Sequence, residues 1–328
     1  MLIAMSEPEL GIFFPGEYRA RLARLAFDAS WVTDTLEQNG RWPATLQMIQ
    51  PEIIVSGWTT PNLSGVVPQS LRYLCHVAGS VRNLVPRESI DQGLIVSNWG
   101  MLHADTVAEC ALMLTLSALR RVQWWGRELH EHRRWRGDFP ESSTLIGKRV
   151  GIHGFGAVAR NLVELLRPFR VQICAFSEGV PEAHFLEKGV QKMASLNELF
   201  TEADIVVEAE ALTPQTHNIV SESLLRMIRP GGAFINVGRG AVVDEAALVH
   251  VAQEGQLQVA LDVYLQEPLP ADSPLRGMPN VTLLPHIAGP TSDRYAECGR
   301  HALENLERYF RGDAIASRVT PEIYDRST

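Results

Sequence analysis

The chain has 328 residues, enough for two domains and a sizeable core, and its apolar, charged, Gly and Pro contents are those of an ordinary globular protein. Its formal net charge of -8 argues against a nucleic-acid or anionic-membrane surface, and its densest basic segment, 127–136, is interleaved with Glu128 and Glu131. No run approaches the ~18 apolar residues of a membrane span, and the N-terminus lacks the basic and apolar regions of a secretion signal.

The cysteines show neither metal-ligand spacing nor a dense disulfide pattern. Each lies far from the others, in or next to an apolar run: Cys75, Cys110, Cys174 and Cys298. This usage predicts reduced, buried thiols and therefore a cytoplasmic protein.

The first hundred residues predict a small parallel sheet. Short apolar runs at 12–14, 52–55, 72–77 and 94–96 are separated by helix-length segments, and 17–27 has helical periodicity. A long helix is expected at 104–122, and it is apolar on most sides, which predicts burial.

The segment 123–139 carries three tryptophans among charges, namely Trp124, Trp125 and Trp135. They are consistent with an arm that contacts a second subunit, and equally with a cover over the chain's own core. Both interpretations stay open at this point.

A strand, a glycine turn, a helix and a second strand follow one another from 149 to 177. Gly154 permits a tight turn, and Gly156 lets the backbone approach a pyrophosphate at a helix N-terminus, where free N–H groups favour anions. Ala159 supplies the small third residue of the motif. This context predicts a dinucleotide site, with Gly154, Gly156, Ala157 and Val158 as candidate contacts.

The alternation of strands and helices continues to residue 310. Strands are expected at 203–207, 233–237, 259–263 and 281–284, and helices at 221–227, 245–253 and 292–310. Counted from Val150, six strands result, which is the number in a full dinucleotide-binding sheet.

Four motifs in this part of the chain resemble the signatures of the D-isomer-specific 2-hydroxyacid dehydrogenases. In chain order they are Gly154-x-Gly156-x-x-Ala159, Asn236-Val237-Gly238-Arg239-Gly240, Ala260-Leu261-Asp262-Val263-Tyr264-x-x-Glu267-Pro268-Leu269 and Leu284-Pro285-His286-Ile287-Ala288-Gly289. The resemblance is nearly continuous from about residue 70 to 312, and looser before that.

The resemblance implies an α/β protein with two Rossmann-like domains. A doubly wound, parallel-sheet cofactor domain, 103–290, would be inserted into a smaller flavodoxin-like substrate domain made of 1–102 and 291–328. It also implies a homodimer acting on a small 2-oxo or 2-hydroxy acid. The cysteine usage adds a cytoplasmic location, and the net charge and the lack of a long apolar run predict neither a nucleic-acid nor a membrane partner.

Hydride transfer at a carbon beside a carboxylate needs a cation for the carboxylate and a proton donor at the 2-oxygen. Arg239 can grip the carboxylate with its planar fork, and the resemblance makes His286 the acid/base. Glu267 resembles the acidic partner of that histidine, where a carboxylate would raise the histidine's pKa and fix its ring.

The remaining site residues are also implied by the resemblance. Asp262, Val237 and Gly238 would lie by the nicotinamide, as would Arg239 and His286, and the loop Ala78-Gly79-Ser80 would bind the substrate carboxylate. Arg82 stands where relatives have aspartate. It would either add a cation that favours a more acidic substrate or make a structural ion pair.

The choice of cofactor depends on the end of the second strand, where NAD-binding relatives usually carry aspartate. This chain has Ser177 followed by Glu178, with no Arg or Lys until Lys188. Serine alone would suit NADP, but Glu178 would repel a 2′-phosphate. The charges favour NAD, and NADP is not excluded.

The sequence thus predicts an NAD(P)-dependent D-2-hydroxyacid dehydrogenase that works as a 2-oxoacid reductase. The alternative is a protein of the same fold that binds nicotinamide dinucleotides as a sensor, like the corepressor relatives of the family. Such proteins keep the same site residues, but extended partner-docking arms are not evident in this sequence.

Overall fold

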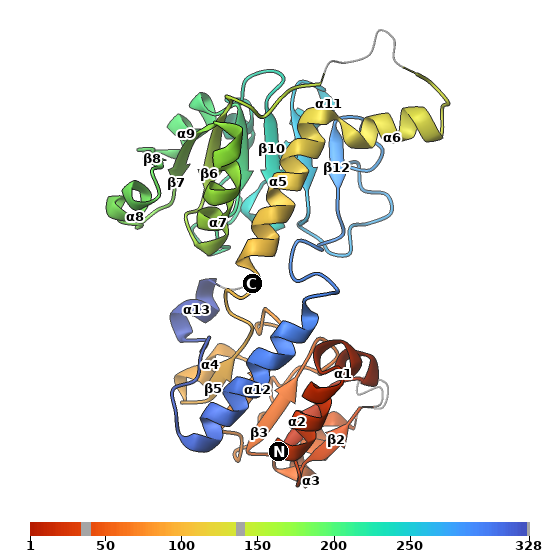
Figure 1. The fold of residues 1–328 in the computed structure, drawn as a ribbon, viewed down its shortest axis with the longest axis vertical. Coiled ribbons are helices and arrows are strands. Elements are labelled where there is room, and N and C mark those ends of the chain that lie inside the picture. The colour runs from red at the N-terminus through yellow and green to blue at the C-terminus, as the bar shows by residue number, and fades with distance from the viewer. Residues whose placement is uncertain (34–40, 136–141, 327–328) are drawn as a thin grey trace. The chain divides into compact units, whose positions relative to one another are not determined.

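The computed structural model describes residues 1–33, 41–135 and 142–326 (Figure 1). The chain forms two compact units, one made of Met1–His103 and Pro290–Thr328 and the other of Ala104–Gly289.

The first unit contains a parallel five-stranded sheet in the order β2-β1-β3-β4-β5, which is the flavodoxin-like order. Its strands are β1 (Leu2–Ala4), β2 (Ser30–Val32), β3 (Ile53–Ser56), β4 (Tyr73–His76) and β5 (Ile95–Ser97). The expected strands near 52–55, 72–77 and 94–96 are therefore confirmed.

Helices from both ends of the sequence build this unit. They are α1 (Glu7–Phe13), α2 (Glu17–Leu25), α3 (Trp42–Ile49), α4 (Arg87–Asp91), α12 (Tyr295–Arg311) and α13 (Pro321–Arg326). One core joins Phe13, Leu22 and Leu303 to one face of the sheet, and a second joins Trp42 and Val319 to the other face.

The expected strand at 12–14 is wrong, because residues through Phe13 end helix α1. Ser6 begins that helix with a capping box: its side chain accepts a hydrogen bond from the Glu9 N–H, and the Glu9 carboxylate accepts from the Ser6 N–H. Strands β1 and β2 were not expected, since three-residue apolar runs carry little periodicity.

The second unit contains a parallel seven-stranded sheet in the order β12-β11-β10-β9-β6-β7-β8. Its strands are β6 (Arg149–His153), β7 (Gln172–Phe176), β8 (Gln191–Lys192), β9 (Ile205–Glu208), β10 (Ala233–Asn236), β11 (Gln258–Leu261) and β12 (Val281–Leu283). The six expected strands are all present, and the two-residue β8 is an addition. The sequence direction of the sheet reverses between β6 and β9, which makes this pair the topological switch point.

Helices cover both faces of this sheet (Figure 1). They are α5 (Ala104–Arg120), α6 (Val122–His130), α7 (Ala157–Leu166), α8 (Glu182–Glu187), α9 (Leu196–Glu202), α10 (Glu222–Leu225) and α11 (Glu245–Gln253), with 3-10 turns at Arg167–Phe169 and Gly240–Val242. Helix α5 is the long apolar helix expected at 104–122, and it buries Ala108, Ala111 and Leu114 against α7 and the sheet.

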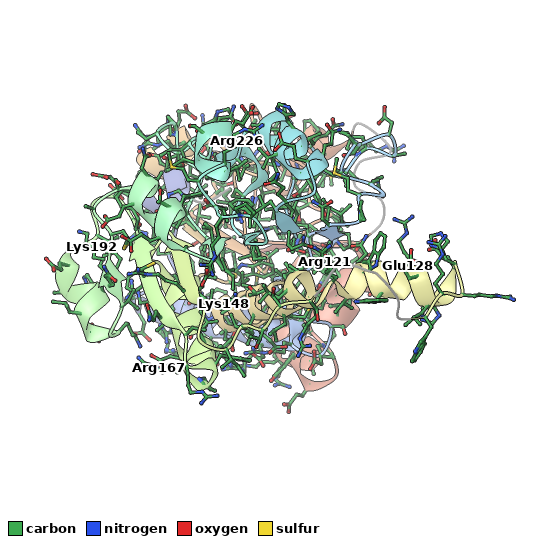
Figure 2. All side chains as sticks on the ribbon, turned by 90° about the horizontal axis from the view of Figure 1, so that it is seen from above. Arg121, Glu128, Lys148, Arg167, Lys192 and Arg226 are labelled. Atoms are coloured by element: carbon green, nitrogen blue, oxygen red, sulfur yellow. The ribbon has the colours of Figure 1, made fainter. Side chains whose placement is uncertain are left out.

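The tryptophan-rich segment begins as helix α6, which projects from the sheet with Arg121 at its start and Glu128 near its end (Figure 2). Trp124 and Trp125 are half-buried, whereas Trp135 is 79% exposed. The rest of the segment, from 136 to 139, lies outside the described residues.

The predicted fold class is confirmed: two parallel α/β units, with the larger inserted into the smaller in sequence. All four cysteines are free thiols, and Cys75, Cys174 and Cys298 are buried. Among the described residues, none of the helices combines the length and apolar character needed to cross a bilayer.

Candidate active site

The candidate residues of the second unit gather at one edge of its sheet. Because its strands are parallel, their carboxyl ends meet at that edge. Each candidate follows one of these ends: Gly154 after β6, Ser177 after β7, Val237 after β10, Asp262 after β11 and His286 shortly after β12.

The glycine turn after β6 has the shape that a pyrophosphate requires. Gly154 has a φ of +92°, and a Cβ there would lie 2.7 Å from the backbone of Ala209, so a side chain is excluded. A Cβ at Gly156 would meet no atom within 4 Å, and Gly156 caps α7 without a side-chain hydrogen bond. The start of α7 is thus not covered by a side-chain cap and leaves room beside Gly156, so the residues present fit a dinucleotide.

The imidazole of His286 is paired with the carboxylate of Glu267. Their Nδ1 and Oε2 atoms are 2.6 Å apart, and the side chains are 48% and 34% exposed. The other oxygen of Glu267 accepts a hydrogen bond from the Tyr264 N–H at 3.0 Å, which holds the carboxylate in place. Because Nδ1 faces Glu267, Nε2 is the ring nitrogen available to a ligand.

Asp262 fixes the backbone that follows His286. Its two carboxylate oxygens accept hydrogen bonds from the N–H groups of Ile287 and Ala288, at 2.8 and 2.9 Å. The side chain is buried, and this burial raises the pKa of Asp262 above its ordinary value, although the two N–H groups partly offset the effect. His286 has a φ of +56°, so the backbone there is held in the left-handed region.

The loop that carries Arg239 packs directly against the segment that leads to Glu267. A Cβ at Gly240 would lie 1.9 Å from the carbonyl carbon of Tyr264, so the two backbones touch. The guanidinium of Arg239 is half-buried, and its Nη1 donates to the Gly238 carbonyl at 2.6 Å. Arg239, Asp262, Glu267 and His286 are thus held by one connected set of loops.

The predicted substrate loop, 78–80, belongs to the other unit. Trp99 packs on it, since a Cβ at Gly79 would lie 2.7 Å from the indole ring. The Asn98 amide donates to the Gly79 carbonyl, and the Trp99 N–H donates to that of Ala78. Ala78 is buried, and Ser80 is exposed.

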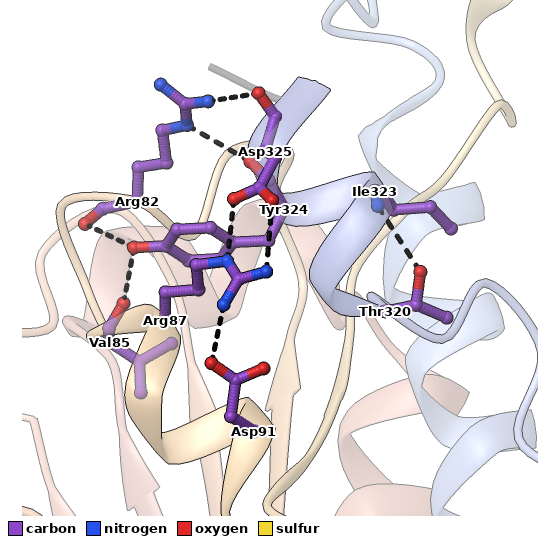
Figure 3. A network of polar contacts seen from close by, with 8 residues as sticks. All are labelled: Arg82, Val85, Arg87, Asp91, Thr320, Ile323, Tyr324 and Asp325. Carbon is purple, nitrogen blue, oxygen red and sulfur yellow. Dashed lines mark hydrogen bonds and ion pairs between the residues drawn. The ribbon is translucent and has the colours of Figure 1, made fainter.

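The structure answers the open question about Arg82. Its guanidinium donates to the backbone carbonyls of Tyr324 and Asp325, at 3.1 and 2.5 Å, and lies over the Tyr324 ring (Figure 3). The Tyr324 hydroxyl in turn donates to the Val85 carbonyl. Arg82 therefore has a structural role at the end of α13, through carbonyls rather than through the ion pair considered above.

Three acidic or basic residues at the switch point were not singled out from the sequence. Glu208 is fully buried at the end of β9, and its Oε2 lies 2.5 Å from Nδ1 of His153, the last residue of β6. Glu210 follows and accepts a hydrogen bond from the hydroxyl of Ser177 at 2.7 Å. The signal was present in the sequence: His153 and Glu208 are ionisable residues that each directly follow an apolar run.

Comparison with known proteins agrees with this geometry. Residues 112–288 match the model of the D-isomer specific 2-hydroxyacid dehydrogenase NAD binding domain. Hydroxyphenylpyruvate reductase of Plectranthus scutellarioides is 34% identical over 231 residues, 70% of this chain and 72% of that relative. Glyoxylate/hydroxypyruvate reductase B of Pectobacterium atrosepticum is 30% identical over 240 residues, 71% of this chain and 74% of that relative.

A solved glyoxylate reductase from Paecilomyes thermophila shares the fold, with a TM-score of 0.83 over 98% of each chain at 24% identity. The chain therefore belongs to the D-isomer specific 2-hydroxyacid dehydrogenases, and it is an NAD(P)-dependent oxidoreductase that acts on the CH–OH group of 2-hydroxy acids.

Proposed function

We propose that the enzyme works as a 2-oxoacid reductase in which Arg239, Glu267 and His286 are the catalytic residues. The observation that carries the proposal is the 2.6 Å pairing of His286 Nδ1 with Glu267 Oε2. A histidine whose ring is oriented by a carboxylate at the carboxyl edge of a parallel sheet is well suited to general acid catalysis.

The nicotinamide cofactor supplies the hydride for the substrate's second carbon when it is bound. His286 donates a proton from Nε2 to the 2-oxo oxygen and takes it back in the reverse reaction. Glu267 keeps Nδ1 as the paired nitrogen and leaves Nε2 for the substrate. Asp262 holds the loop after His286 through the two N–H groups that it accepts.

Arg239 binds the substrate carboxylate in this proposal. One of its N–H groups already donates to the Gly238 carbonyl, which orients the fork, and a guanidinium has five N–H donors in all. The backbone of Ala78, Gly79 and Ser80 supplies further donors to the same carboxylate. On this basis we assign the substrate-binding role to 1–102 and 291–328, and the cofactor-binding role to 103–290.

Gly154, Gly156, Ala157 and Val158 would hold the pyrophosphate, Ser177 would lie near the adenosine, and Val237, Gly238 and Asp262 would lie near the nicotinamide. We propose NAD as the preferred cofactor, because Glu178 follows β7 directly and a 2′-phosphate needs cations.

We further propose a cytoplasmic homodimer. The free state of all four thiols supports a reducing compartment. Apolar side chains exposed on α5 and α6, namely Met113, Val122 and Leu129, support a contact with a second copy. Light scattering after size exclusion tests this, because a monomer at micromolar concentration would contradict the assignment.

The test of the reaction is oxidation of NADH, and separately of NADPH, with glyoxylate, hydroxypyruvate, pyruvate and branched or aromatic 2-oxoacids. The panel includes the substrates for which the two relatives are named. His286→Ala should lower kcat by about 10²- to 10⁴-fold, and Arg239→Ala should raise KM for the 2-oxoacid strongly.

The matched controls are His250→Ala and Arg226→Ala. His250 also faces a carboxylate, that of Glu222 at 3.3 Å, but on the surface of α11, and Arg226 pairs with Glu254. Full activity in His286→Ala would contradict the proposed mechanism. Tight dinucleotide binding without turnover on any acid would instead favour the sensor alternative.

A further inference from the structure

The ends of β7 and β9 are joined by a hydrogen bond from the Ser177 hydroxyl to Oε2 of Glu210, at 2.7 Å. Strand β6 lies between β7 and β9 in the sheet, so this contact spans the end of β6. The turn at Gly154 rests on the same segment, because a Cβ there would lie 2.7 Å from Cα of Glu210. Glu210 therefore lies at the switch point, beside the turn that fits the pyrophosphate.

Glu210 is held in one position by its neighbours. Its N–H donates to Oε1 of Glu208 at 2.8 Å, and its own Oε1 accepts from the Ala211 N–H at 2.9 Å. Glu208 is anchored in turn by the buried His153. The carboxylate of Glu210 is thus preorganised before any ligand binds.

This carboxylate keeps hydrogen-bonding capacity. An ionised carboxylate can accept about four hydrogen bonds, and the Ser177 hydroxyl and the Ala211 N–H use one on each oxygen of Glu210. The side chain is half-buried, so its remaining capacity can face a ligand. Two neighbouring hydroxyls of a ribose are donors of the right kind and spacing for such a group.

In dinucleotide-binding sheets, an acidic residue at the end of the second strand usually accepts from the adenosine ribose. Here that position is Ser177, which is 6% exposed and gives its hydroxyl hydrogen to Glu210. The expected acid is thus absent from the end of β7, while Glu210, from the segment after β9, reaches the same place.

We propose that Glu210, oriented by Ser177, binds the hydroxyls of the adenosine ribose and selects NAD over NADP. This inference rests on the proposed function and moves the discrimination from Glu178, which is exposed, to Glu210. A 2′-phosphate would replace a donor by an anion directly beside the Glu210 carboxylate.

The surroundings strengthen this discrimination. Glu178 lies in the loop after β7, and the next helix, α8, begins at Glu182 and ends at Glu187. The two lysines near it are engaged elsewhere: Lys188 pairs with Glu164 at 3.0 Å, and Nζ of Lys192 donates to the Val180 carbonyl at 3.0 Å. A 2′-phosphate at this point would have to displace Lys188 or Lys192 from its present partner.

The experiment measures binding of NADH, NADPH and 2′-deoxy-NADH to the full chain without any 2-oxoacid, by nucleotide fluorescence and calorimetry. The wild type should bind NADH at least about tenfold more tightly than NADPH. Glu210→Gln should weaken NADH binding about tenfold and leave NADPH binding unchanged or make it tighter. Glu210→Gln should also abolish the preference for NADH over 2′-deoxy-NADH. Ser177→Ala should weaken NADH binding about threefold.

Glu178→Gln is the matched control, because it removes the same charge from the residue next to Ser177, in the loop after β7. It should change the NADH affinity less than about twofold. Unchanged NADH affinity in Glu210→Gln, or an equal loss in Glu178→Gln, would overturn the inference while leaving the proposed function intact. Wild-type binding of neither dinucleotide would overturn the proposed function itself, and a thermal melt of each variant identifies a folding defect.

Discussion

The carboxylate of Glu208 lies 2.5 Å from Nδ1 of His153, and neither side chain is more than 2% exposed. Burial lowers the pKa of His153, but the charge of Glu208, its hydrogen bond and the charge of Glu210 outweigh that effect, so the pKa is raised overall. The pair lies directly under the glycine turn, because His153 is followed by Gly154.

His153→Leu should be strongly destabilising, by about 3–5 kcal/mol, because it leaves the buried Glu208 without its partner. His153→Leu/Glu208→Gln should recover part of that loss, since the uncompensated charge is gone while an oxygen remains for the Glu210 N–H. Urea unfolding of the three proteins measures this. If His153→Leu were as stable as the wild type, this would show that the pair carries no charge in the wild-type protein.

The same pair predicts a dependence of stability on pH. Because the folded pKa of His153 is raised, its contribution is fully present below the ordinary histidine pKa of about 6.5 and is lost as the pH rises through the folded value. The wild type should therefore lose stability relative to the double variant as the pH rises above about 6.5. Parallel stability curves for the two proteins would contradict this.

Glu267→Gln should lower kcat about a hundredfold with a smaller effect on NADH affinity, because the amide keeps the hydrogen bond to His286 but not the charge. Steady-state rates and NADH titration separate the two effects. Glu222→Gln is the control, since it removes the acid of the exposed pair with His250. A kcat within twofold of the wild type would mean that the charge of Glu267 plays no part in the reaction.

Arg82→Ala should destabilise the first unit by about 1–2 kcal/mol and raise KM for the 2-oxoacid without changing NADH affinity. Its two hydrogen bonds to α13 carbonyls hold the chain just beyond Ser80, next to the proposed substrate loop. Arg87→Ala is the control, because Arg87 contacts the side chain of the same Asp325 from α4. Equal KM changes in the two variants would show that α13 as a whole, rather than Arg82, positions the loop.

Gly240→Ala should abolish activity, because its Cβ would lie 1.9 Å from the Tyr264 carbonyl carbon and would push apart the loops that carry Arg239 and Glu267. Gly126→Ala, inside α6 with no atom within 4 Å of the added Cβ, should instead stabilise the protein by up to about 1 kcal/mol. Activity assays and thermal unfolding of both variants check this. An active Gly240→Ala enzyme would show that the two loops can separate without loss of function.

The six longer strands of the second sheet could be predicted from the sequence because each is built around a short apolar run. Since the strands are parallel, the edge that gathers Asp262 and His286 followed from the same pattern. The elements at the start of the chain were harder to predict. The apolar run at 12–14 fits a strand as well as a helix end, and the deciding signal was the capping box of Ser6 and Glu9.

The contact of Ser177 with Glu210 could not be predicted, because it joins strands that are not neighbours in the sheet. Its two residues are 33 positions apart, and no local pattern relates them. The role of Arg82 was hidden for the same reason, since its partners lie 242 and 243 residues away.

Helix α12 packs so closely on α1 that a Cβ at Gly299 would lie 1.7 Å from the Phe13 carbonyl oxygen, and Cys298, Ala302 and Leu303 are buried in the core that also holds Phe13. During synthesis from the N-terminus, the core of residues 1–103 therefore stays incomplete until these C-terminal residues have been made. The unit 104–289 is continuous and can complete its own core earlier. The order of emergence from the ribosome thus favours folding of the inserted unit before the unit that surrounds it in sequence.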